Sequence, residues 1–419
     1  MTERLLQYIW QFQYFNKNEL QTTTGENVQV IHPGIHNIHQ GPDFTDAKIL
    51  IGNTTWAGNV ELHLQTKQWH QHEHHTDKNY NNVILHVVYE DDESDSLINI
   101  PVIELHQRIS NILISRYLEW MERKSFIPCE SAISQVKQLT WSAWIDRLLA
   151  ERLTRKAETV FTFLKKSNHN WEDVFWWLLA RNFGAHVNAD AFEHMARSIP
   201  LKLLGKHKNN LLQLEALLFG QAGLLNESFQ DDYSIMLQKE YAFLKNKYKL
   251  QPVYITPLFL RMRPGNFPTI RLAQLAMLVH HSSHLFSKIR EANHAEEIKE
   301  WLNVSANDYW HYHYRLDEPT TYKPKNLGKA MINNIIINTM APVIFAYGQY
   351  HQQEIYKEKA LHWLESCSAE NNSITSGYQQ LGIKNATAAE SQALIELKNE
   401  YCHYKRCLDC AVGNAIIRE

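Results

Sequence analysis

Apolar and polar positions alternate in several runs within the first 110 residues. Between residues 54 and 64, small or apolar side chains recur at every second position, and this period of two predicts a strand with one wet face. The pair Gly52-Asn53 separates this strand from the apolar run 47–51 and predicts a hairpin. The run 83–89 is apolar on both faces and predicts a buried central strand.

Helical spacing precedes and follows these strands. Apolar residues at spacings of three and four predict a helix over residues 5–12, and two further apolar runs predict strands over 27–31 and 97–105. After about residue 108 the helical spacing predominates, in residues 141–163, 171–180, 209–222, 233–247, 268–281, 294–302, 328–346, 353–366 and 388–411. The pattern predicts an α+β protein with an α/β domain at 1–110 and a larger all-α domain at 111–419.

The distribution of charge follows the same boundary. The chain has 419 residues and a net charge of −3. Residues 1–110 contain 6 Lys and Arg against 14 Asp and Glu, a net charge of −8, whereas residues 111–419 carry +5. The near-neutral total excludes a polybasic, histone-like binder and an acidic disordered protein. We expect any polyanion to be bound mainly by the helical domain.

Three features of the sequence bear on cellular location. The N-terminal residues include an acid and lack a long apolar run with a small-residue cleavage site, so they do not form a signal peptide. The longest apolar stretches are far shorter than the ~20 residues needed to span a membrane. Five cysteines, an odd number in a large chain, do not indicate a disulfide framework. We therefore expect a cytoplasmic protein with no membrane segment.

Two carboxylates flank the predicted hairpin. Asp43 precedes its first strand, and Glu61-Leu62-His63 begins 18 residues later in its second strand. Paired carboxylates bind hard cations through oxygen, and a neighbouring hydrogen-bonding group orients the attacking water or stabilises developing phosphate charge. The spacing predicts a Mg²⁺ or Mn²⁺ site at Asp43 and Glu61, with His63 as the third catalytic residue.

The register of the hairpin decides whether these side chains share a face. Glu61 and His63 are two residues apart and lie on one face of the strand. A strict two-residue turn pairs Asp43 with Leu62 and places Asp43 on the opposite face. A three-residue loop pairs Asp43 with His63 instead. The site therefore requires an odd loop or a β-bulge, a feature that is common beside active sites.

Pro42-Asp43 followed by Glu61-x-His63 resembles the motif of the PD-(D/E)XK nuclease superfamily, and the order of helix, strands, hairpin and buried strand is similar too. The resemblance covers about the first 110 residues. It implies a three-layer α/β restriction-endonuclease-like core, a divalent metal at Asp43 and Glu61, and phosphodiester cleavage. His63 stands where that superfamily usually has Lys, and a histidine is mostly neutral near pH 7.

The chain as a whole resembles an uncharacterised bacterial family of unknown function, a resemblance that implies no activity. The segments that carry it are 41–44, 56–63, 83–88, 263–268 and 407–410. The sequence contains no Gly-x-Gly-x-x-Gly, Walker A or Gly-x-Ser-x-Gly motif. Nucleotide-hydrolysing and serine-hydrolase activities are therefore disfavoured.

Histidine is unusually frequent, with 23 copies, and four of them lie in the run 70–75. Their spacing suits neighbours on one face of a strand or a helix, and either could hold Zn²⁺ or another transition metal through His72 and His74. The alternative is a polar loop with one or two of these histidines turned toward Glu61. His86 lies inside the buried strand, and we expect it to be a hydrogen-bonded core residue.

Three cysteines form the pattern Cys402-x4-Cys407-x2-Cys410. In a chain without a disulfide framework, this spacing predicts a zinc site or an iron–sulphur cluster, with Cys129 as the fourth ligand and Cys367 as the alternative. On one continuous helix Cys402 and Cys407 would point about 140° apart, so the helix must end between them. The other interpretation is three small buried side chains in a terminal helix.

Basic residues surround the start of the predicted helix 268–281. Arg263 precedes it and Arg271 lies in its first turn. A helix N-terminus flanked by arginines is well suited to bind phosphate, so we expect both residues to contact a nucleic-acid backbone. The alternative is a solvated helix face stiffened by Arg–Glu pairs.

These patterns predict a metal-dependent, nuclease-like protein that hydrolyses phosphodiesters at Asp43, Glu61 and His63, with nucleic acid as its partner. The alternative is an inactive nuclease fold that serves as a binding or scaffold protein, since the usual Lys is absent and the first domain is acidic. A third hypothesis is a Zn²⁺ hydrolase built on the histidines of residues 70–75.

Overall fold

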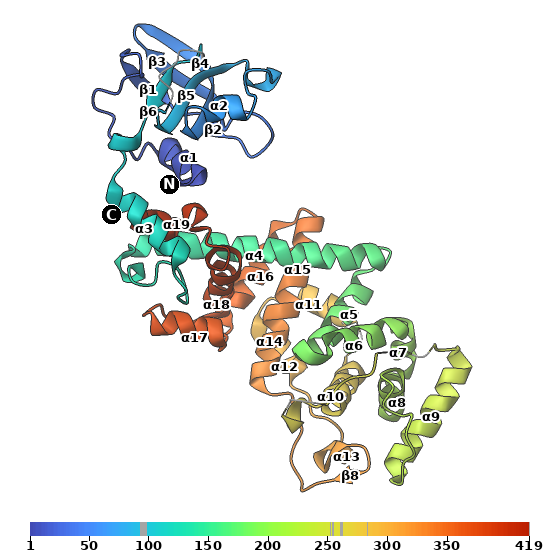
Figure 1. Ribbon diagram of the computed structural model, residues 1–419. Coiled ribbons are helices and arrows are strands. Elements are labelled where there is room, and N and C mark those ends of the chain that lie inside the picture. Colours follow the sequence, from blue (N-terminus) through green and yellow to red (C-terminus); the bar gives the residue numbers. More distant parts are fainter. Residues whose placement is uncertain (93–98, 252, 254, 260–262, 283, 419) are drawn as a thin grey trace. The chain divides into compact units, whose positions relative to one another are not determined.

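A computed structural model describes residues 1–92, 99–251, 253, 255–259, 263–282 and 284–418 (Figure 1). The chain combines an N-terminal sheet with a larger helical part, as predicted. It divides into two compact units, of which the first contains residues 1–144 and 397–419 and the second contains residues 145–396. The second unit is therefore inserted into the first. The predicted boundary at residue 110 falls within the first unit, at the start of α3 (Asn111–Glu122).

Six strands form one mixed sheet in the first unit. They are β1 (Val28–His32), β2 (Ile35–His36), β3 (Phe44–Ile51), β4 (Thr54–Gln65), β5 (Val83–Glu90) and β6 (Val102–Glu104). Their order is β1-β3-β4-β5-β6, with β2 beside β3. The β3–β4 pair is antiparallel, whereas β4–β5 and β5–β6 are parallel. The predicted buried central strand is confirmed as β5; residues 97 and 98 of the last predicted strand lie outside the described residues.

The β3–β4 hairpin contains the irregularity on which the candidate site depends. Ile51 pairs with Thr54 across a two-residue turn, so the three-residue loop does not form. The register shifts by one residue between Ala47 and Phe44, where Asp46 has a left-handed backbone with φ of 58°. This β-bulge turns the residues that precede Phe44 to the face of the sheet that carries Glu61. The requirement for an odd loop or a bulge, derived from the sequence, is therefore met by a bulge.

Helix α1 (Glu3–Phe12) packs against β4 and supplies much of the core of the first unit. Trp10 is completely buried, and its Nε1–H donates a 2.9 Å hydrogen bond to the carbonyl oxygen of Pro33. The side chain of Thr2 accepts the backbone N–H of Leu5 and so caps the helix, a contact worth about 1 kcal/mol. The helix predicted from apolar spacing is confirmed.

The face of β4 that the alternation assigns to water is buried around the candidate site. Glu61 is only 5% exposed and His63 only 1%. Helix α2 (Gln68–Gln71) packs against β4 and buries Trp69, so the chain that follows β4 covers this face. The predicted strand is confirmed, but its burial does not alternate, because residues 60–63 are all buried. The predicted wet face is therefore wrong here, since side chains from the following segment cover it.

Helices make up most of the second unit. From α4 onward they are α4 (Gln138–Lys166), which begins in the first unit, α5 (Trp171–Phe183), α6 (Ala185–Ser198), α7 (Leu201–His207), α8 (Leu211–Gln221), α9 (Asp232–Tyr248), α10 (Pro268–His281), α11 (Leu285–Glu291), α12 (Ala295–Leu302), α13 (Asp308–His311), α14 (Lys329–Ile335), α15 (Ala341–Tyr350), α16 (Glu354–Ser366), α17 (Ser373–Gln380) and α18 (Ala388–Glu396). The last helix, α19 (Ala411–Arg418), belongs to the first unit. A short hairpin of β7 (His313–Arg315) and β8 (Glu318–Pro319) lies between α13 and α14. The three-layer restriction-endonuclease-like arrangement of the first domain stays a prediction.

Every predicted helical stretch contains α-helix, but some boundaries differ. The stretch 388–411 is interrupted, since α18 continues as a π-helical turn, η6 (Leu397–Cys402), and the chain then reverses at Lys405, which has φ of 52°. Helix α6 is not predicted by the sequence. It follows α5 after the single residue Gly184, and this junction leaves no polar loop to mark the boundary.

One apolar helical stretch in the described chain, Lys329–Tyr350, has the length and composition of a membrane span. It runs through α14, the π-helical η5 (Ile336–Met340) and α15. Of its most apolar window, 67% is buried inside the structure, as in the core helix of a soluble protein. This burial agrees with the expectation of no membrane segment, whereas the cytoplasmic location stays a prediction.

We predict opposite effects of alanine at two helical glycines of the second unit. A Cβ at Gly220 would lie 2.1 Å from the ring of Tyr241, so Gly220→Ala should overpack the α8–α9 contact and destabilise the protein by about 1–3 kcal/mol. At the exposed Gly205 no described atom lies within 4 Å of the added Cβ, so Gly205→Ala should stabilise α7 by about 0.5–1 kcal/mol. Urea unfolding followed by circular dichroism measures the free energy of unfolding of both variants. Equal changes in this free energy would contradict the packing described at Gly220.

Candidate metal centre

Asp43 and Glu61 lie together, at the start of β3 and in the middle of β4. The backbone N–H of Asp43 donates a 2.9 Å hydrogen bond to Oε2 of Glu61. In return, the backbone N–H of Leu62 donates a 3.1 Å hydrogen bond to Oδ2 of Asp43. Because the bulge makes Phe44 pair with Val60, Asp43 lies beside Glu61 and not beside His63.

A third residue, Gln7, joins this pair from α1. Its Nε2–H donates a 2.7 Å hydrogen bond to Oδ1 of Asp43, so both oxygens of that carboxylate accept a neutral donor. Sequence reasoning missed Gln7. Its one signal is a polar side chain between the buried residues Leu6 and Tyr8, a position that also occurs at the edge of many ordinary amphipathic helices.

Burial and mutual repulsion make this carboxylate pair electrostatically unfavourable when no cation is bound. Removal from water is the main cause that raises the pKa of both Asp43 and Glu61. The neighbouring charge of Glu3 raises the pKa of Asp43 further, and the charge of Asp43 raises that of Glu61. A bound cation would reverse this effect, because it stabilises both carboxylates in their ionised form.

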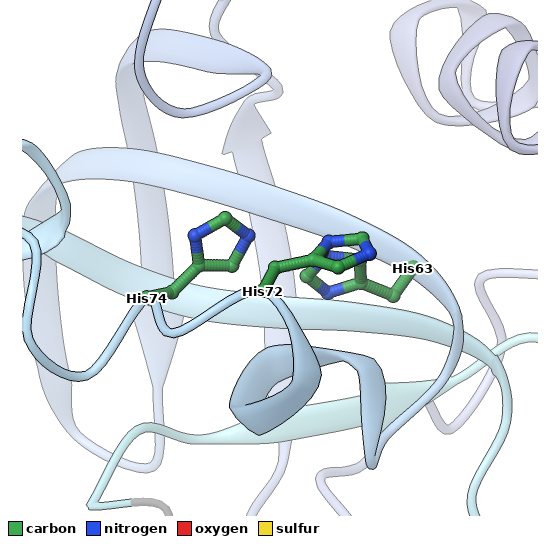
Figure 2. A group of neighbouring side chains, drawn as sticks. All are labelled: His63, His72 and His74. Atoms are coloured by element: carbon green, nitrogen blue, oxygen red, sulfur yellow. Dashed lines mark hydrogen bonds between the residues drawn. The ribbon is translucent and has the colours of Figure 1, made fainter.

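Three histidines lie next to Glu61. The candidate ligand atoms of His63, His72 and His74 all lie within 4.8 Å of one another, and Figure 2 shows the three imidazoles gathered where the chain after α2 passes over β4. Nε2 of His63 is 3.2 Å from Nδ1 of His72. Oε1 of Glu61 is 3.6 Å from Nε2 of His63 and 3.4 Å from Nε2 of His74.

The segment after α2 positions His72 and His74 through a turn. Glu73, between them, has a left-handed backbone with φ of 57°, so the two flanking side chains point toward the same region. The ring of His74 stacks on Tyr80 with a centroid distance of 3.8 Å. His70 lies outside the group and contacts the ring of His75. Of the two interpretations of the 70–75 run, the structure shows a short helix and turn that direct two histidines toward Glu61.

His86 lies on β5, beside Glu61 in the parallel register. A hydrogen bond of 2.8 Å joins its Nε2 to Nδ1 of His63, with one ring donating and the other accepting. The other nitrogen of His86, Nδ1, is buried without a hydrogen-bond partner among the described residues. The expected hydrogen-bonded core histidine is therefore bonded at only one of its two ring nitrogens. His86 therefore holds the ring of His63 in its orientation through this hydrogen bond.

Burial keeps these imidazoles neutral. Burial, and to a smaller extent repulsion between the neighbouring rings, lowers the pKa of His63 to about 2, of His86 to about 3 and of His74 to about 4. A neutral imidazole offers a nitrogen lone pair to a metal. The buried Nε2 of His74 has no hydrogen-bond partner among the described residues, which leaves that lone pair available.

The donor atoms fit a transition metal. Ligand atoms about 2.0–2.2 Å from a tetrahedral Zn²⁺ lie about 3.3–3.6 Å apart, which matches the distances from Oε1 of Glu61 to Nε2 of His63 and Nε2 of His74. Imidazole nitrogen with one or two carboxylates suits Zn²⁺ or Mn²⁺ better than Mg²⁺, which prefers oxygen ligands. The centre therefore contains imidazole nitrogens beside the two expected carboxylates. The spacing of Asp43 and Glu61 alone does not predict these nitrogens.

The predicted nucleic-acid contacts lie in the second unit. Arg263 is exposed and precedes a short 3₁₀ turn, Pro264–Asn266. Arg271 donates hydrogen bonds to Asn266 (2.6 Å) and Gln274 (3.0 Å), and burial lowers its pKa to about 10. It lines a cavity of about 650 Å³. The predicted helix start at Pro268 is confirmed, whereas binding of nucleic acid by the two arginines stays a prediction.

A model of the family described as "Protein of unknown function (DUF2851)" matches residues 3–373. The match spans the whole sheet and most of the inserted helical unit, so it agrees with the resemblance to a family of unknown function. No curated protein and no solved structure matches the chain. The chemistry of the centre therefore has to be inferred from its own side chains.

We predict that Glu61→Gln stabilises the metal-free protein, and more so at higher pH. The folded-state pKa of Glu61 lies above the unfolded-state value, so its contribution to stability is greatest at low pH and is lost as the pH rises. In a chelator, the variant should be close to wild type near pH 5 and more stable by at least about 1 kcal/mol at pH 8. Thermal unfolding measures this, with Glu73→Gln, at an exposed glutamate, as the matched control. A pH-independent difference would contradict the assignment.

Proposed function

Since the chain belongs to the DUF2851 family, whose description states no function, we propose from the site alone that the protein is a metal-dependent phosphodiesterase. The observation that carries the proposal is the meeting of two carboxylates, the half-buried Asp43 and the buried Glu61, with neutral imidazole nitrogens at metal-ligand spacing. Perturbed carboxylates and neutral histidines gathered in one place are characteristic of catalytic and metal sites.

The proposed ligands are Glu61, His63 and His74, with His72 at the exposed edge of the group. Zn²⁺ or Mn²⁺ bound there would lower the pKa of a water and polarise a phosphoryl oxygen. His72 is exposed, whereas His63 is buried, so the side of the centre at His72 is where solvent and substrate would enter. Closed structural sites, by contrast, surround the metal with protein ligands.

Asp43 is the residue best placed to accept a proton. Its Oδ1 accepts from Gln7 and its Oδ2 from the N–H of Leu62, and each oxygen keeps a second lone pair. These two neutral donors hold the carboxylate at a fixed angle without neutralising it. Burial, and after it the charge of Glu3, raise the pKa of Asp43 to about 7, so a bound cation would favour the ionised form that accepts a proton.

Phosphodiesters are proposed as substrates because of the Pro42-Asp43 and Glu61-x-His63 arrangement and its likeness to PD-(D/E)XK nucleases. The hairpin that carries both carboxylates, the preceding helix α1 and the following parallel strand β5 support this assignment. His63 does not take the role of the usual Lys. Both of its ring nitrogens contact other histidines, so it positions the centre and leaves phosphate contacts to other groups.

A second candidate, a non-catalytic binding protein on the same fold, is favoured by one observation. Glu61 and His63 are at most 5% exposed, which leaves little surface for a polymeric substrate at these two ligands. In that case the histidine–carboxylate group would hold a structural ion, and its removal would change stability without a loss of activity.

We predict hydrolysis that depends on Mn²⁺ or Zn²⁺. The purified chain, stripped with a chelator and reloaded with each ion, should cleave bis(p-nitrophenyl) phosphate, DNA or RNA. Asp43→Asn and Glu61→Gln should each lower the rate by about 100-fold or more, because general-base catalysis contributes factors of that size. Asp46→Asn is the matched control, since Asp46 is exposed and Asn adopts its left-handed backbone readily.

Isothermal titration with the same ions distinguishes the two candidates. Binding by the wild type that His74→Ala weakens, together with hydrolysis that Asp43→Asn removes, supports the enzyme. Metal binding without hydrolysis of any of the three substrates would overturn the phosphodiesterase proposal and leave the binding protein. Absence of metal binding would contradict both versions.

A further inference from the structure

Four of the five cysteines lie in the first unit, although more than 250 residues of sequence separate Cys129 from the other three. Cys402, Cys407 and Cys410 belong to residues 397–419, which complete this unit after the helical insertion. Cys129, Cys407 and Cys410 are buried, and Cys402 is half-buried. Buried thiols that come from two distant segments need a physical reason to converge.

The helix ends where a thiol site requires it to end. The π-helical η6 stops at Cys402, and the left-handed Lys405 turns the chain before Cys407 begins the short 3₁₀ turn η7 (Cys407–Asp409). The backbone N–H of Lys405 donates to the carbonyl oxygen of Cys402 at 3.2 Å and closes this turn. The condition that the sequence pattern sets, an interruption between the first two cysteines of the trio, is met.

The turn that carries Cys410 directs backbone donors at its sulfur. Burial raises the pKa of the Cys410 thiol, and the N–H groups of Gly413 and Val412, in the first turn of α19, hydrogen-bond to this sulfur and oppose part of that rise. Gly413 permits the close approach, since a Cβ there would lie 2.3 Å from the carbonyl oxygen of Cys407. Asn414 donates hydrogen bonds to the carbonyl oxygens of Leu408 (2.8 Å) and Cys410 (3.0 Å) and holds the turn closed.

Cys129 faces this turn from the loop between α3 and the 3₁₀ turn η3 (Ile133–Gln135). Helix α19, which starts directly after Cys410, packs against both α3 and η3. The thiol of Cys129 interacts electrostatically with those of Cys402, Cys410 and Cys407, in decreasing order of strength. These interactions place the thiols of the trio in the same neighbourhood of the first unit as that of Cys129.

The alternative fourth ligand, Cys367, belongs to the other unit. Cys367 ends α16 in the second unit, and the charged groups that act on its thiol are Lys299 and Glu296. The sequence leaves Cys129 and Cys367 as alternatives, and the structure places Cys129 in the unit that holds the trio.

We propose that Cys129, Cys402, Cys407 and Cys410 bind one thiolate-coordinated metal centre, a Zn²⁺ ion or an iron–sulphur cluster. Four thiolates on one centre are the ligand set of structural zinc sites and of most iron–sulphur clusters. Each thiol releases its proton when it binds, because the positive charge of the metal stabilises the thiolate. Lys405 interacts with the thiol of Cys407 and offsets part of the negative charge of the centre.

This centre is independent of the proposed phosphodiesterase. Its role would be structural, because it joins the chain before the helical insertion to the chain after it. A cross-link between such distant residues removes much conformational freedom from the unfolded chain, and its binding free energy adds to folding of the first unit.

The test is metal analysis of the full chain purified without oxygen. We expect about one thiolate-bound centre per chain. An iron–sulphur cluster would show visible absorption and acid-labile sulfide, whereas zinc would be colourless and, after exchange for Co²⁺, would give a sulfur-to-cobalt charge-transfer band. That band requires thiolate ligands, so metal at the histidine centre does not produce it.

Cys407→Ser and Cys129→Ser should each lower the occupancy of this centre by about tenfold or more, whereas Cys367→Ser, the matched control, should retain it. If the serine variants do not fold, thiol labelling of the wild type decides: a chelator that extracts the metal should expose three or four additional thiols. The proposal is overturned if the wild type, purified or reconstituted with zinc, cobalt, or iron and sulfide, shows no thiolate–metal signature. It is also overturned if Cys129→Ser binds metal like the wild type.

Discussion

Two reciprocal hydrogen bonds between Asp43 and β4 hold together carboxylates that would otherwise repel each other. The N–H of Asp43 donates to Glu61, and the N–H of Leu62 donates to Asp43. These bonds exist because the bulge at Asp46 shifts the hairpin by one residue. Without that shift Asp43 would lie on the opposite face, and the chemistry of the centre would lose one of its two acids.

Helix α1 contacts both the histidine–carboxylate group and the turn that carries Cys410 in the first unit. Gln7 of this helix donates to Asp43 at the histidine–carboxylate centre. The next residue, Tyr8, donates its hydroxyl to Asn414, the residue that holds the turn around Cys410. Gln7 and Tyr8 therefore connect the carboxylate Asp43 to the turn around Cys410 by a short path of covalent and hydrogen bonds within the first unit.

The sequence predicted the elements better than the contacts between them. Apolar periodicity located α1, β4, β5 and nearly all the long helices, because burial of one face leaves a local signature. The spacing of Asp43 and Glu61 predicted their meeting, subject to a bulge. The left-handed Asp46 has no such signature, so the position of that bulge could not be read. The contact of His63 with His86 depends on parallel pairing of β4 and β5 across a crossover, and no local pattern contains that pairing.

The insertion of the helical unit has a consequence for synthesis of the chain. About 250 residues separate the two segments that make up the first unit. At about 5–20 residues per second, a ribosome needs tens of seconds to translate them. During that time the nascent sheet lacks α19, and the cysteine trio does not yet exist to receive a metal. The helical unit, which is contiguous, can fold within this interval, so the order of synthesis favours assembly of the first unit after the second.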